Sequence, residues 1–260
     1  MVQSSETMNR RAFVAGMALL GVTARKHPIA AAAESEPSAP FALARTISPQ
    51  TRPLLIAHNA DTVEQIAASA AAGADIIEAD VWHTDDGLLV SHILGIGDWT
   101  PPISIAEAVF NAIPLEEWLD SLPTDRTAMF DIKNEAPSTT RMVAQALNNS
   151  SGHQSAYLCS PYWPHILAAE SYSNLTGVYT VNSEEGLGEI FPLINRSGHR
   201  GLSIAKKLVT PEIVMAAHDL GAFVFVWTVN DVSEAQQFAN LGVDGITTDL
   251  LEDLLAALAD

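Results

Sequence analysis

The sequence predicts an α/β fold, a single-domain (β/α)₈ TIM barrel, and two observations carry that prediction. From residue 52 onwards, apolar runs alternate with helical patterns in about eight units, and such alternation implies a parallel sheet. Eight units in roughly 200 residues are typical of a closed barrel. A doubly wound sheet is the alternative, although the chain has no glycine-rich phosphate loop of either common type.

Each element follows from its local pattern. Strands are predicted at short apolar runs, at residues 53–58, 74–82, 127–133, 156–160, 175–181, 201–205, 222–229 and 243–248. Helices are predicted where apolar residues recur at helical spacing, over 61–72, 104–122 (interrupted by Pro114), 139–147, 211–220, 232–241 and 250–258. Three of these helices end at a glycine that precedes the next strand, at Gly73, Gly221 and Gly242.

The first 33 residues have the layout of an export signal. Arg10 and Arg11 precede an apolar stretch over residues 13–24, and the alanines at 30–33 form a small-residue cleavage site. The arginine pair, with Phe13 two residues on, resembles a twin-arginine signal, and an ordinary export signal is the alternative. We therefore expect an exported protein, either periplasmic or secreted.

The apolar stretch of this signal is too short to be a membrane anchor. It has about 12 residues, whereas roughly 20 are needed to cross a bilayer, and no cysteine lies near the alanines to carry a lipid. Residues 34–51 are rich in Ser, Pro and Ala and are predicted to form a linker. Residues 52–260 are left for the barrel domain.

The composition excludes several classes of protein. The chain has 13 basic and 31 acidic side chains, a formal net charge of −18, so we expect no nucleic-acid partner. One cysteine excludes an intrachain disulfide and a cysteine-rich zinc module. The acidity argues against tight docking on anionic membranes. Contact with a membrane stays one alternative, although we expect no membrane anchor. An anionic substrate would need a local cation or a metal.

Charged side chains interrupt the apolar strands predicted for the first part of the barrel. Glu78 and Asp80 are two residues apart and so point to one face, and Asp131 and Lys133 repeat this spacing on the third strand. Three carboxylates held close together raise one another's pKa, and a divalent cation removes that penalty. All-oxygen ligands favour one Mg²⁺ or Ca²⁺. The alternatives are an ion-paired barrel layer and a simple Asp131–Lys133 salt bridge.

Two histidines lie where the barrel mouth is expected. His58 ends the first strand, and His92 ends the segment 87–92 that follows the second. Because the carboxyl ends of barrel strands form the active-site face, these side chains and the carboxylates can converge there. Two imidazoles suit acid and base roles near neutral pH, and Lys133 could hold a phosphate oxygen. The set is typical of metal-assisted phosphodiester cleavage, whereas each histidine taken alone could be structural.

Five stretches resemble the glycerophosphodiester phosphodiesterase family and occur in the family's order. They are residues 57–92 (with GADIIEADV and TDDGLLVSH), 113–122 (IPLEEWLDSL), 130–133 (FDIK), 226–230 (VWTVN) and 242–249 (GVDGITTD). The resemblance covers most of residues 54–255 and implies a TIM barrel. It implies His58 and His92 as the catalytic acid–base pair and, as metal ligands, Glu78, Asp80 and Asp131. It also implies substrate contacts at Lys133 and Trp227.

The chain departs from the family pattern at three places. Asn59 replaces the arginine that follows the first histidine, and it is a candidate either for a phosphate contact or for a turn. The family's Glu-Asn-Thr loop is absent, which shortens the gap between His58 and Glu78. Asp131 stands where most members have Glu. The last two features are similar to the sphingomyelinase D and phospholipase D branch, whose enzymes can form a cyclic phosphate.

The function predicted from these features is metal-dependent hydrolysis of small phosphodiesters, either glycerophosphodiesters or lysophospholipids. One alternative is a phospholipase D or sphingomyelinase D-like enzyme, for which Ile93-Leu94-Gly95-Ile96 and Trp99 would supply apolar mouth loops. The other is a non-catalytic lipid- or phosphate-binding barrel, which the missing arginine at Asn59 suggests. The head group, the choice of Mg²⁺ or Ca²⁺, the division of acid and base roles and the oligomeric state stay open.

Overall fold

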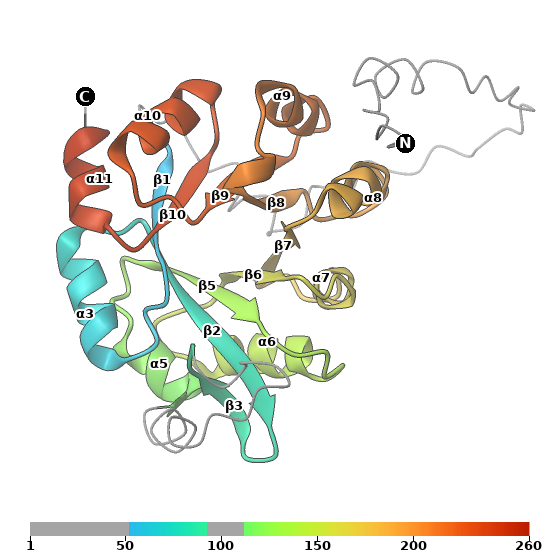
Figure 1. Ribbon diagram of the computed structural model, residues 1–260. Coiled ribbons are helices and arrows are strands. Elements are labelled where there is room, and N and C mark those ends of the chain that lie inside the picture. Colours follow the sequence, from blue (N-terminus) through green and yellow to red (C-terminus); the bar gives the residue numbers. More distant parts are fainter. Residues whose placement is uncertain (1–51, 93–111, 260) are drawn as a thin grey trace, which may run out of the picture. The chain divides into compact units, whose positions relative to one another are not determined.

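The computed structural model describes residues 52–92 and 112–259, which form a closed barrel of parallel strands with helices outside it (Figure 1). Pairing of β1 with both β2 and β10 closes the sheet, so the predicted (β/α)₈ barrel is confirmed. The parallel strands are β1 (Leu54–Ala57), β2 (Ile76–Thr84), β5 (Thr127–Ile132), β6 (Ala156–Ser160), β7 (Leu175–Val181), β8 (Gly201–Ala205), β9 (Phe223–Trp227) and β10 (Gly245–Thr248).

Helices follow the strands and bury their apolar faces against the outside of the sheet. They are α3 (Val63–Ala72), α5 (Leu115–Ser121), α6 (Thr139–Asn149), α7 (Pro164–Ala169), α8 (Glu184–Ile194), the 3₁₀ helix η2 (Lys206–Leu208), α9 (Pro211–Asp219), α10 (Val232–Leu241) and α11 (Leu251–Ala257). The predicted stops at Gly73 and Gly242 are confirmed. Both glycines adopt the left-handed conformation that ends a helix at low steric cost.

Two helices, α7 and α8, are missing from the sequence prediction. The sequence of α8 contains three residues that are poor helix formers and interrupt the helical pattern: Gly186, Gly188 and Pro192. Its first turn is nevertheless capped, because the Ser183 hydroxyl accepts a hydrogen bond from the Gly186 N–H at 3.1 Å. The helix α7 has six residues, too few for periodicity to stand out.

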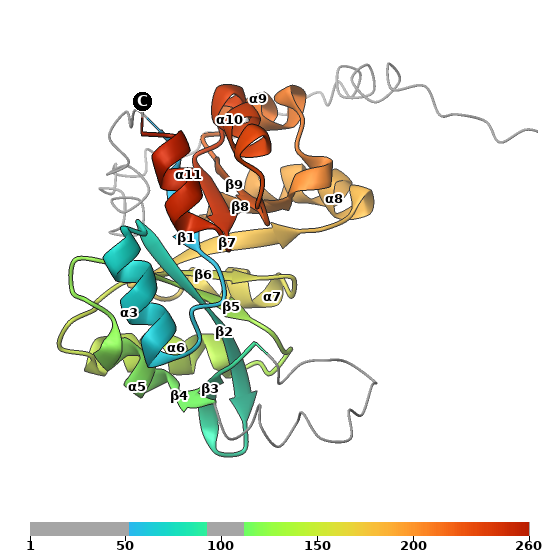
Figure 2. The same ribbon diagram turned by 60° about the vertical axis from the view of Figure 1, so that its left-hand side comes forward.

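The β2 strand continues past the barrel and turns back into a hairpin. It pairs antiparallel with β3 (Gly87–Val90), and β3 pairs antiparallel with β4 (Ile113–Pro114). Figure 2 shows the hairpin extending beyond the neighbouring strands. Of the helix predicted over 104–122, residues 104–111 lie outside the described ranges. The prediction is wrong at 113–114, where Pro114 occupies an edge strand in which no N–H is required, and the helix α5 begins at Leu115. The hairpin brings the chain back to the barrel at His92.

The barrel interior is apolar at one end and charged at the other. Its apolar part is a separate cluster from the layer between sheet and helices, and consists of Leu54, Ile56, Ile76, Met129, Tyr157, Cys159, Val178, Phe223 and Phe225. Since inward-facing residues alternate along a strand, Ile76 is followed on the same face by Glu78 and then Asp80. The charged groups therefore lie next to the apolar cluster, on its side toward the carboxyl ends of the strands.

Other predictions fall outside these residues. The export signal (1–33) and linker (34–51) do so, as do the apolar candidates Ile93-Leu94-Gly95-Ile96 and Trp99. Within the described ranges, no helix combines the length and apolar character that crossing a bilayer requires.

Gly245 on β10 makes room for the aromatic plug of the barrel. A Cβ atom there would lie 2.6 Å from Phe225 Cδ1 and 3.4 Å from Ile56 Cδ1. Phe225 packs against Phe223 and Tyr157 with ring-centroid distances of 4.8 and 5.6 Å, so its ring has little freedom to move away.

We expect Gly245→Ala to destabilise the protein by roughly 1–3 kcal/mol, the usual cost of overpacking a core. Urea unfolding followed by circular dichroism measures this change. Gly188→Ala is the matched control, because Gly188 is exposed on helix α8, nothing lies within 4 Å of its added Cβ, and alanine favours a helix. Equal stability of the two variants would contradict the close packing at Gly245.

Candidate active site

Three carboxylates meet where the first half of β2 lies beside the carboxyl end of β5. Glu78 and Asp80 lie on β2, and Asp131 lies beside Asp80 in the register of β5. One oxygen atom from each of the three side chains lies within 4.8 Å of the others. Glu78 and Asp80 are buried, with relative exposures of 3% and 1%. The structure thus brings together the three residues predicted to hold a metal.

Lys133 partly balances these charges. Its Nζ lies 2.7 Å from Asp80 Oδ1 and 2.5 Å from Asp131 Oδ2, so the ammonium group joins two of the three carboxylates. The third, Glu78, accepts a hydrogen bond from the Asn59 backbone N–H through Oε2 at 2.9 Å. One lysine against three carboxylates leaves the cluster with an excess of negative charge.

The pKa values in the cluster reflect that excess. Burial raises the pKa of Glu78 well above its ordinary value, and Asp80 adds to the effect while Lys133 opposes it. Burial also raises the pKa of Asp131, against the opposing charge of Lys133. Burial alone would lower the pKa of Lys133, but Asp131, Asp80 and Glu78 together hold it above its ordinary value.

The donor set fits a divalent cation. All three candidate ligands offer carboxylate oxygens, the hard donors that Mg²⁺ and Ca²⁺ prefer. A charge of +2 at this position would offset the excess that Lys133 leaves. Glu78, Asp80 and Asp131 could therefore hold a metal.

His58 and His92 each have one ring nitrogen on a carboxylate. His58 follows β1, and its Nδ1 lies 2.7 Å from Asp249 Oδ1, while His92 Nδ1 lies 2.8 Å from Asp80 Oδ2. The two ring centroids are 6.4 Å apart. Because Nδ1 is engaged in both rings, Nε2 of each is left to exchange a proton.

Asp249 and Asn230 belong to this site, and the sequence reasoning assigned neither a role. Asn230 Nδ2 donates to Asp249 Oδ2 at 2.6 Å, and the Asp249 N–H donates to Asn230 Oδ1 at 2.9 Å. Burial would raise the pKa of Asp249, but hydrogen bonds from Asn230 and His58 lower it below its ordinary value. Both residues end motifs noted in the sequence, VWTVN and GITTD, at positions that follow a strand as His58 does.

Asn59 has a backbone role in this site. Its φ of 55° lies in the left-handed region, which asparagine tolerates better than most residues. This turn aims its N–H at Glu78, and its side-chain Nδ2 lies 3.2 Å from His58 Nδ1. The turn role predicted as one alternative is therefore present, and the phosphate contact stays a prediction.

Trp227 lies at the carboxyl end of β9, two residues beyond the inward-facing Phe225. Its Nε1 is buried and has no hydrogen-bond partner among the residues of the structure that are described. A buried indole N–H without a partner is an unsatisfied hydrogen-bond donor. The substrate contact of Trp227 stays a prediction.

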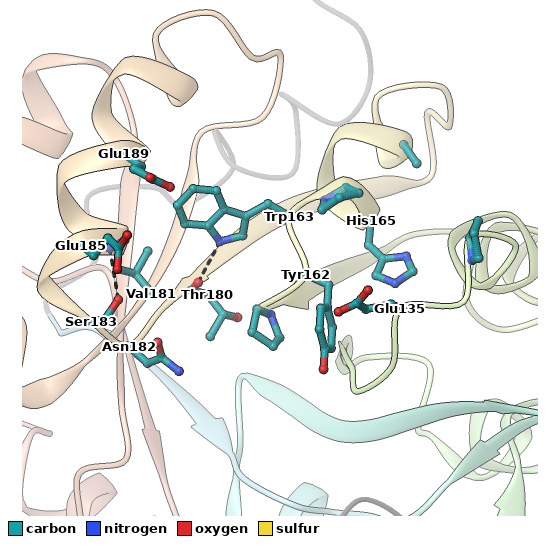
Figure 3. Close-up of a pocket in the computed structure, with 15 residues that line it drawn as sticks. Glu135, Tyr162, Trp163, His165, Thr180, Val181, Asn182, Ser183, Glu185 and Glu189 are labelled. Carbon is teal, nitrogen blue, oxygen red and sulfur yellow. Dashed lines mark hydrogen bonds between the residues drawn. The ribbon is translucent and has the colours of Figure 1, made fainter. Parts of the chain in front are cut away.

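Two cavities lie at the carboxyl ends of the strands. One of about 590 Å³ is lined by both histidines together with residues 59–62, Gln65, Ala68, Ser69, Ser91 and Asp249. The other, of about 640 Å³, lies between the loops after β6 and β7, where Tyr162 and Trp163 face Asn182 and Glu185 (Figure 3). The second cavity contains none of the predicted site residues.

Comparison with known proteins agrees with this architecture. Residues 176–252 match the family model described as "Glycerophosphoryl diester phosphodiesterase family". No match was found among curated proteins.

Solved structures of related fold extend the similarity to most of the chain. A proposed glycerophosphoryl diester phosphodiesterase from Silicibacter pomeroyi is similar with a TM-score of 0.70 and 19% identity, over 86% of this chain and 98% of that one. A phosphodiesterase from Oleispira antarctica, solved with the product sn-glycerol-3-phosphate, is similar with a TM-score of 0.65 and 18% identity, over 80% and 98%. A glycerophosphodiester phosphodiesterase from Thermotoga maritima is similar with a TM-score of 0.63 and 18% identity, over 78% of this chain and 97% of that one. The resemblance predicted from the sequence is thus confirmed: the chain has the fold of the glycerophosphoryl diester phosphodiesterases, and its residues 176–252 match that family.

Proposed function

We propose that the protein is a metal-dependent phosphodiester hydrolase that acts on glycerophosphodiesters. The observation that carries the proposal is the meeting of three carboxylates and two carboxylate-bound histidines at one end of the barrel. The family match at residues 176–252 supports the same reaction class. The sn-glycerol-3-phosphate bound to the Oleispira antarctica neighbour supports a glycerol phosphate ester as substrate.

Glu78, Asp80 and Asp131 would hold one divalent cation, Mg²⁺ or Ca²⁺. A divalent cation bound there would polarise the phosphate group and offset the negative charge that develops during the reaction. Lys133 reaches both Asp80 and Asp131, so it would orient these ligands and could also hold a phosphate oxygen. The Trp227 indole N–H would donate to the substrate, and Asn59 would position Glu78 and His58.

His58 and His92 would exchange protons with the attacking water and the leaving alcohol. Asp249 orients the His58 ring through Nδ1, and Asp80 orients the His92 ring in the same way. The two ring centroids lie 6.4 Å apart, so both imidazoles are close enough to act on one bound phosphodiester. One histidine would take the proton from water while the other gives a proton to the leaving oxygen.

We also propose that the protein is exported by its N-terminal signal, on the basis of Arg10, Arg11 and the alanines at 30–33. We expect the N-terminus of the mature protein to lie just after the alanine run, because small residues there suit a signal peptidase. N-terminal sequencing of protein recovered from a bacterial periplasm checks this. An intact Met1 on all of the recovered protein would contradict it.

We expect purified protein with Mg²⁺ or Ca²⁺ to release sn-glycerol-3-phosphate from glycerophosphocholine, as measured by phosphorus NMR. His58→Ala and His92→Ala should each lower the rate by roughly 10²–10⁴-fold, the usual contribution of a positioned acid or base. His218→Ala is the control, because this exposed histidine lies on α9 and pairs with Asp244. Lysophosphatidylcholine and sphingomyelin complete the substrate set.

The products separate this proposal from its alternatives. A cyclic phosphate from a lysophospholipid or sphingomyelin would favour the phospholipase D-like reaction. No metal-dependent product from any of the three substrates would contradict the hydrolase and favour a binding protein.

We expect Mg²⁺ or Ca²⁺ to raise the melting temperature above that in chelator, because a ligand that binds only the folded state stabilises it. Asp131→Asn should reduce this response while leaving the metal-free protein at least as stable as wild type, since it removes one of three crowded negative charges. Asp120→Asn, an exposed change on α5, is the control. An Asp131→Asn protein with the full metal response would argue against the site.

A further inference from the structure

A second group of metal-ligating atoms lies beside the first and shares Asp80 with it. Asp61, Asp80 and His92 each offer one ligand atom, and these three atoms lie within 4.8 Å of one another. Asp80 lies between the two groups, because its Oδ1 contacts Lys133 while its Oδ2 contacts His92. The sequence patterns assigned no role to Asp61.

Asp61 is held in place with one oxygen atom unused. Its Oδ1 accepts a hydrogen bond from the Asp80 N–H at 3.0 Å, and its own N–H donates to Gln65 Oε1 at 3.1 Å. Only 6% of the residue is exposed. Its Oδ2 is buried and has no hydrogen-bond partner in the described part of the chain. A buried carboxylate oxygen without a partner is costly unless something binds it.

We propose that Asp61, Asp80 and His92 form a second, Zn²⁺-binding site next to the Glu78–Asp80–Asp131 cluster. Two carboxylate oxygens and an imidazole nitrogen are a mixed donor set that suits Zn²⁺, whereas the first cluster offers oxygen alone. Asp61 and His92 also line the cavity of about 590 Å³, which gives an ion access from solvent and leaves room for a water ligand.

The local charge favours a second cation. Asp61 adds a fourth carboxylate to a group in which Lys133 is the one lysine, so one divalent ion at the first cluster leaves the group negative. Zn²⁺ at the second site would more than offset the negative charge that remains. It would also bind the imidazole that Asp80 orients, and it would therefore inhibit the reaction, a consequence that rests on the proposed role of His92.

Zinc stoichiometry measured by equilibrium dialysis tests the site. We expect wild-type protein to bind two Zn²⁺ in the absence of other metals. Asp61→Asn should bind one, because asparagine keeps the acceptor for the Asp80 N–H but loses the anionic oxygen, and its affinity for the second ion should fall about tenfold or more. Asp120→Asn should still bind two.

Two further measurements guard against a folding defect in the variant. Imidazole nitrogen NMR of wild-type protein with the first site filled by Mg²⁺ should show a His92 signal that moves on adding Zn²⁺. Asp131→Asn should keep one Zn²⁺ and the same movement of the His92 signal, since it lacks only the first cluster.

Either of two results would overturn the proposal: one Zn²⁺ per wild-type chain, or a His92 signal that Zn²⁺ does not move. Zinc inhibition of Mg²⁺-loaded enzyme, lost in Asp61→Asn, would support the inhibitory role. Two bound Zn²⁺ in a protein without phosphodiesterase activity would leave the second site standing and contradict the proposed function alone.

Discussion

Repulsion between like charges inside the barrel is the constraint on which the site depends. The inward positions of β2 and β5 are apolar near the start of each strand, at Ile76 and Met129. Further along the same strands, they are occupied by Glu78, Asp80 and Asp131. Buried carboxylates at such positions are unfavourable without compensation. The fold supplies part of the compensating charge and hydrogen bonding. Lys133 pairs with two of the carboxylates, and the Asn59 backbone N–H donates a hydrogen bond to the third.

The need for this compensation explains why residues from several elements contact one another at the carboxyl-terminal end of the barrel. The left-handed turn after β1 matters because it aims the Asn59 N–H at Glu78. The hairpin of β2 and β3 is needed because it returns His92 to Asp80.

Much of the barrel could be predicted because its signals are local. The alternation of inward and outward residues places Glu78 and Asp80 on one face, and the glycine stops at Gly73 and Gly242 mark helix ends. The helix α8 could not be predicted, because its glycines and proline hide the pattern and its apolar face is defined by packing on the sheet.

Local sequence patterns cannot predict which residues orient the side chains of the site. Asp249 and Asn230 end two sequence motifs, but the contact of Asp249 with His58, and that of Asn230 with Asp249, exist only once distant strands are adjacent. Asp61 is similar, since its role depends on the N–H of Asp80 and on burial. Sequence motifs therefore indicate the reactive groups, while the residues that hold them in position emerge from tertiary structure.

The contact between His58 and Asp249 joins the two ends of the barrel, because one residue follows the first strand and the other follows the last. The two residues are 191 positions apart in the sequence, and all strands of the described sheet except β1 lie between them. An incomplete chain that lacks β10 can contain all three carboxylates and both histidines and still leave the His58 ring unoriented. The orientation of this imidazole therefore depends on closure of the barrel and not only on the residues near His58 in the sequence.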